Sequence, residues 1–166
     1  MSSDTQDAAP SIAMRGIIGA TFDELNVGDE HWSPGRTVTE TDIVNFCALS
    51  GDWNPHHSDA LFAGETAMGE RIAPAALVVA IAAGLVVRLR VFEGTIVALL
   101  EWTYKFTKPV VIGTRLQVRL RVLSKRETSN PTRGVVRWEV AAFNENDDQA
   151  AVGEWTMLML RTSLPV

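Results

Sequence analysis

The 166-residue chain has a single cysteine, Cys47, and only three histidines. One cysteine cannot form an internal disulfide, and it excludes a thiolate metal cluster. A reducing, cytoplasmic location is therefore expected. The histidines are His31, His56 and His57, and no other histidine–carboxylate pair supports the adjacent two, so we expect no metal site.

Basic blocks and long hydrophobic runs are also missing. The formal net charge is −5, and no basic stripe stands out, which argues against a nucleic-acid partner. The longest apolar run, 72–87, is short for a bilayer span and contains Pro74 and Gly84. We expect no membrane insertion. A helix that is apolar on every side should instead be buried all round.

The composition fits one globular domain, with 46% hydrophobic and 21% charged residues. Residues 1–20 lack the basic start and sustained apolar stretch of a secretory signal. We expect them to form a flexible leader, followed by a single domain over 21–166.

Helical patterns occupy the first half of this domain. Thr39 and Asp42 resemble a capping box, apolar residues follow at helical spacing, and Gly51 ends the segment. The composition of 51–59 favours turns. A short helix is predicted over 59–67, followed by the long apolar helix, with its proline in the first turn.

After Gly94 the pattern changes to alternation. In 115–123 leucine and valine alternate with arginine and glutamine, as in a strand with one wet face. Further strands are predicted near 30–38 and over 95–107, 134–143 and 151–161. The chain therefore predicts an α+β domain in which a curved antiparallel sheet wraps around the apolar helix, which is the hot-dog fold. Such a sheet leaves a surface for a second copy, so a homodimer or higher homo-oligomer is expected.

The stretch 50-SGDWNPHHSD-59 concentrates polar chemistry in ten residues. One interpretation is a polar turn that ends a helix, because Asp and Asn accept hydrogen bonds from nearby amides. The other pairs Asp52 with His57, whose side chains can converge across the Asn-Pro turn and hold one water. Asn54 would then orient the turn.

The string FCALSGDWNPHHSD resembles the MaoC-like dehydratases, the (R)-specific enoyl-CoA hydratases, whose signature is S-G-D-x-N-P-x-H-x-D. The segment 102-WTYKFTKPVVIGT-114 is also similar to that family's F-x-x-P-V-x-x-G strand, and the resemblance covers roughly 20–162. It implies that Asp52 and His57 activate water and that Ser50 and Asn54 support them.

The resemblance also implies the reaction, a reversible addition of water to a trans-2-enoyl thioester of coenzyme A or acyl carrier protein, with no separate cofactor. Charge develops on the thioester oxygen and needs a preorganised donor. The family supplies a glycine amide in an H-G pair, where this chain has Pro74 and Ala75. Ala75 still offers its backbone N–H. Ala83 also replaces a small polar residue.

Four candidate substrate contacts and two other functions remain open. Trp53, Pro74 and Ala83 are candidates for shaping the substrate channel, and Arg71 for meeting the carrier's phosphates. The alternatives are an acyl-CoA thioesterase of the same fold and a catalytically impaired, acyl-thioester-binding subunit of a hetero-oligomeric hydratase.

Overall fold

The computed structural model describes residues 19–161 of the chain. Most of the expected leader lies outside these residues. Its last two members are tied to the domain, because the N–H groups of Gly19 and Ala20 donate to the carbonyls of Glu93 and Val91 at 2.7 and 2.6 Å.

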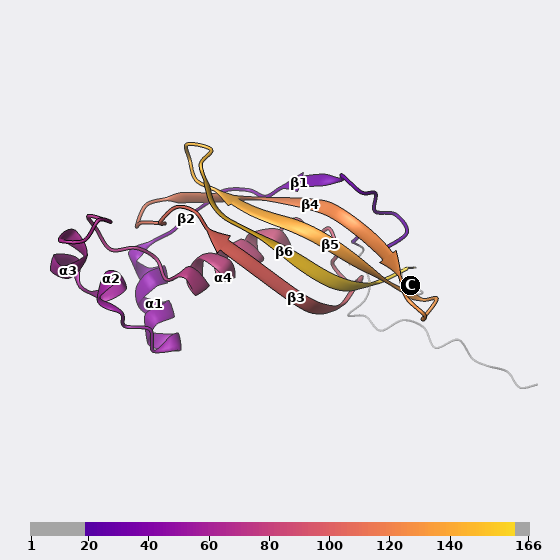
Figure 1. Cartoon of the computed structure of the whole chain (residues 1–166), viewed down its shortest axis with the longest axis horizontal. Helices are drawn as coiled ribbons and strands as arrows, with labels where there is room; N and C mark the ends of the chain where they lie inside the picture. Colours follow the sequence, from indigo (N-terminus) through magenta and orange to yellow (C-terminus); the bar gives the residue numbers. More distant parts are fainter. Residues whose placement is uncertain (1–18, 162–166) are drawn as a thin grey trace, which may run out of the picture.

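Six strands form one antiparallel sheet, which confirms the α+β expectation. Their bounds are β1 Glu30–Trp32, β2 Arg36–Thr37, β3 Ile96–Phe106, β4 Arg115–Glu127, β5 Arg133–Phe143 and β6 Gln149–Leu160. The order is β1-β4-β5-β6-β3, and β2 also pairs with β4. The long strands lie side by side as a curved sheet (Figure 1). Among the described residues, β3 pairs only with β6, so its outer edge is free.

Strand β4 shows the predicted alternation. Leu116, Val118 and Leu120 are fully buried, whereas Gln117 and Arg119 between them are half-exposed. The apolar face packs on the core with Trp138 of β5. The arginine-rich face is the solvent-facing side of the sheet, as expected.

Four helices precede the long strands. They are α1 Glu40–Ser50, α2 Pro55–Ser58, α3 Ala60–Gly64 and α4 Ala75–Val87. The capping box at Thr39 and Asp42 is present, and Gly51 ends α1 with a positive φ of 77°. The helix α2 was not expected, because we predicted only turns over 51–59. Pro74 lies at the N-cap of α4 rather than in its first turn.

The apolar helix α4 runs along the sheet, and α1, α2 and α3 gather beyond one end (Figure 1). One face of α4 is buried in the core through Leu77, Ile81 and Leu85. The expectation that α4 is buried all round is wrong for a single chain. Its opposite face is exposed at small or apolar residues, namely Ala75, Ala76, Ala80, Gly84 and Val87.

None of the helices in 19–161 is long and apolar enough to cross a membrane.

Candidate active site

The turn after α1 places Asp52. Gly51 adopts the left-handed conformation that glycine tolerates best, and its N–H donates to the carbonyl of Cys47 at 2.8 Å. Ser50 braces the turn from the helix end. Its hydroxyl donates to the carbonyl of Phe46 at 2.7 Å and accepts the N–H of Asp52 at 3.2 Å. The Asp52 side chain is 46% exposed.

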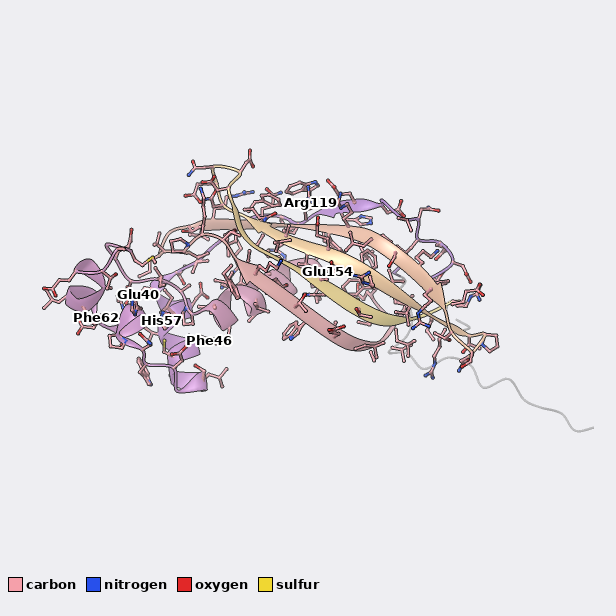
Figure 2. All side chains as sticks on the ribbon, in the orientation of Figure 1. Glu40, Phe46, His57, Phe62, Arg119 and Glu154 are labelled. Atoms are coloured by element: carbon pink, nitrogen blue, oxygen red, sulfur yellow. The ribbon has the colours of Figure 1, made fainter. Side chains whose placement is uncertain are left out.

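The single turn α2 places His57. Asn54 caps it, because its side-chain oxygen accepts the N–H of His56 at 3.1 Å. Pro55 occupies the first helical position, where a missing N–H costs nothing. The carbonyl of Asn54 accepts the N–H of His57 at 2.8 Å. His57 thereby points back towards the turn after α1, and its side chain is only 13% exposed. In Figure 2 it lies among the helices, with Phe46 and Glu40.

The two side chains meet at a distance that suits a bridging water. His57 Nε2 and Asp52 Oδ2 are 3.8 Å apart. This separation exceeds a direct hydrogen bond, and a polar contact of this length often holds a water between its partners. The convergence that the spacing predicted is therefore present.

A backbone contact fixes the histidine tautomer. His57 Nδ1 lies 2.8 Å from the carbonyl oxygen of Ile72. A carbonyl only accepts, so Nδ1 carries the proton. In a neutral ring Nε2 is then an acceptor facing Asp52. Two acceptors on either side of one water can each receive one of its hydrogens, which leaves the water's lone pairs free to attack.

Both side chains line a cavity of about 620 Å³. Its wall also contains the first residues of α4, the loop that follows β3, and part of the segment that leads into α4 (Met68, Ile72, Ala73, Ala75, Ala76, Val78, Phe106, Thr107, Lys108, Pro109 and Val110). The first N–H groups of a helix have no partner within the helix, and no side chain caps those of α4. They therefore offer a donor site of positive potential. Ala75 is the first of these residues.

The other sequence candidates lie outside the lining of this cavity. Trp53 is 53% exposed, Pro74 is buried behind the start of α4, and Ala83 is half-buried one turn or more further along. Arg71 donates two hydrogen bonds of 2.6 Å to the carboxylate of Glu40. Its guanidinium is thus engaged by a carboxylate, and substrate contacts by these four residues stay predictions.

A second cavity, which we call the aromatic groove, was not predicted. It measures about 460 Å³ and lies between α4 and β3 (lined by Phe46, Ala75, Ala76, Val79, Ala80, Trp102, Tyr104 and Phe106). The Trp155 indole N–H donates to the Tyr104 hydroxyl oxygen at 3.0 Å. Burial raises the pKa of Tyr104 to about 12. The alternating aromatic residues of 102–106 were the available sequence signal for this groove. That they face α4 follows only from the folded sheet.

In the stretch from Gly19 to Arg161, no three His, Cys, Asp or Glu side chains gather in a way that would hold a metal ion. The arrangement at Asp52 and His57 is suited to moving a proton to or from a bound water.

The fold and the site together define a hot-dog unit with an acidic and an imidazole group beside the start of its central helix. The chain belongs to the MaoC-like domain family, whose model matches residues 26–143. It is 40% identical to Protein MaoC of Klebsiella aerogenes over 107 residues, which are 64% of this chain and 31% of that protein. The chain thus spans about a third of that relative's length.

Solved structures agree with this assignment. R-hydratase PhaJ1 from Pseudomonas aeruginosa is 32% identical, with a TM-score of 0.69 over 88% of this chain and 94% of that one. A conserved hypothetical protein from Mycobacterium tuberculosis, described as a double hotdog fold, is 20% identical with a TM-score of 0.78. The alignment covers 89% of this chain and 47% of the Mycobacterium tuberculosis protein. This likeness supports the hot-dog fold of the chain.

Proposed function

We propose that the protein is an (R)-specific enoyl-thioester hydratase, which adds water reversibly to a trans-2-enoyl group carried by coenzyme A or acyl carrier protein. The observation that carries the proposal is the 3.8 Å separation of His57 Nε2 and Asp52 Oδ2 in the wall of one cavity with Ala75. Membership of the family and the likeness to an R-hydratase support it.

In the forward direction the held water attacks the β-carbon of the enoyl group. A C–O bond forms, the water loses one proton to the Asp52–His57 pair, and the pair delivers a proton to the α-carbon, so that the pair returns to its starting protonation state. Negative charge develops meanwhile on the thioester oxygen. The N–H of Ala75 at the start of α4 stabilises this charge, because amides fixed in advance need no reorganisation during the reaction. Dehydration is the same path reversed.

Hydration of crotonyl-CoA tests the reaction, followed as loss of the enoyl absorbance with chiral analysis of the product. We expect (R)-3-hydroxybutyryl-CoA and no free thiol. Asp52→Asn and His57→Gln should each lower kcat by about a hundred- to ten-thousand-fold. Release of free thiol would instead identify a thioesterase. Tight binding of the thioester without turnover would identify a non-catalytic subunit.

We also propose that the working form is a homodimer. The exposed face of α4 adjoins the free edge strand β3, where six large apolar side chains are exposed (Ile96, Val97, Leu99, Leu100, Trp102 and Phe106). Several exposed apolar side chains on an unpaired edge strand are typical of an interface. The double-hotdog protein has the length for two such units in one chain, which is consistent with pairing of units.

Light scattering on the purified chain tests the assembly, with twice the chain mass expected. Leu100→Lys places a charge on β3 where the side chain is 55% exposed and should convert the dimer to monomer. Leu61→Lys is the matched control, because Leu61 is 84% exposed but lies on α3, away from this surface. A monomeric wild type would contradict the homodimer, and recovery of activity only with a second protein would indicate a hetero-oligomer.

A further inference from the structure

The candidate catalytic cavity and the aromatic groove adjoin each other. Their linings have three residues in common, Ala75 and Ala76 on α4 and Phe106 on β3. We call the space between these residues the passage. A substrate that extends from the catalytic pair into the aromatic groove must pass through the passage.

The Phe106 side of the passage is held in position. Its ring stacks on Tyr104 with centroids 6.3 Å apart and an interplanar angle of 20°. Tyr104 is anchored in turn by the 3.0 Å hydrogen bond from the Trp155 indole. Trp155 is itself buried, 3% exposed. Phe106 is itself 47% exposed, and this stacking places its ring at the edge of the passage.

On the opposite side, Ala75 presents two groups with separate roles. Its N–H belongs to the uncapped first turn of α4, and its side chain is a single methyl group on an exposed residue that lines both cavities. A thioester oxygen that accepts the N–H lies about 3 Å from the nitrogen. An acyl chain that runs from this carbonyl carbon into the aromatic groove passes between Ala75 and Phe106, so its α-carbon lies beside the Ala75 side chain.

We propose that the Ala75 methyl group is a specificity determinant: it admits acyl chains that are unsubstituted at the α-carbon and disfavours those with an α-methyl branch. This inference rests on the proposed function. The substitution Ala75→Gly removes the methyl and keeps the N–H, so it separates selectivity from oxyanion stabilisation. In an apolar site, one methyl or methylene changes discrimination about 10- to 200-fold.

The test compares crotonyl-CoA with (E)-2-methylbut-2-enoyl-CoA in wild type, Ala75→Gly and Ala75→Val. The measured quantity is kcat/KM for the branched substrate divided by kcat/KM for the unbranched one. We expect this ratio to rise at least about tenfold in the glycine variant and to fall in the valine variant. Ala60→Gly is the matched control, because Ala60 is also an exposed first residue of a helix, α3, and lines neither cavity.

A ratio that is the same in all four proteins overturns the inference and leaves the hydratase proposal intact. A ratio that rises equally in Ala60→Gly also overturns it, since general loosening would then explain the effect. Absence of hydration of both substrates by the wild type overturns the proposed function and this inference with it. The valine variant keeps the test decisive if the glycine variant folds poorly, because the two are expected to shift the ratio in opposite directions.

Discussion

Replacing Ala75 with proline tests the donor at the start of α4. Proline has no N–H, so Ala75→Pro deletes the proposed oxyanion donor. The first helical position tolerates proline, because its N–H has no partner within the helix. The preceding residue, Pro74, already has a ψ of 137°, within the range that a residue before proline adopts. The fold should therefore survive the change.

The size of the effect follows from what is lost. Removal of one oxyanion-hole donor costs about a hundred- to a thousandfold in kcat, or roughly 2.7–4 kcal/mol of transition-state stabilisation. Ala75→Val is the control, because it adds a similar bulk at the passage but keeps the N–H. The difference in kcat between the two variants isolates the donor.

The assay is steady-state hydration of crotonyl-CoA, with thermal unfolding of each variant as a check on folding. We expect the proline variant to unfold close to the wild-type temperature and to be at least about a hundredfold slower than the valine variant. If a folded proline variant matches the valine variant, the Ala75 amide does not stabilise the oxyanion.

Two further predictions concern the sheet. The chain has one tyrosine, Tyr104, and burial raises the pKa of its hydroxyl to about 12. Phenolate absorbance should therefore appear near pH 12 in the folded protein. In denaturant the same absorbance should appear about two pH units lower. Because the unfolded form loses this proton first, stability should fall as pH rises above about 10; a folded-state transition near 10 would contradict the burial of Tyr104. Gly153→Ala should prevent folding or destabilise the protein by more than about 3 kcal/mol, because a Cβ there would lie 1.8 Å from the carbonyl oxygen of Thr103. Expression and denaturant melts measure it, and a variant with wild-type stability would show that β3 and β6 pair differently.

Local patterns predicted the elements that depend on local chemistry. The capping box at Thr39 and the left-handed Gly51 bound α1 as expected. Alternation in 115–123 identified both faces of β4. The Asp52–His57 convergence was also predictable, because the two residues are only five positions apart across an Asn-Pro turn.

Long-range contacts were not accessible in this way. The bond that orients His57 reaches Ile72, fifteen residues away, and Arg71 meets Glu40 across 31 residues. The aromatic groove joins α1 to β3, which only the folded sheet brings together. The exposed face of α4 was missed for another reason. The residues 72–87 are apolar on every side, so their pattern alone does not show which face of α4 the sheet buries and which it leaves exposed.

The most direct test of the account compares Asp52→Asn, His57→Gln and the double variant in the hydration of crotonyl-CoA. If both side chains hold the same water, either substitution alone disables the unit, so the double variant should be little slower than the worse single variant. If the losses in kcat multiply, or if either single variant retains wild-type turnover, the two residues do not act together and the account is contradicted.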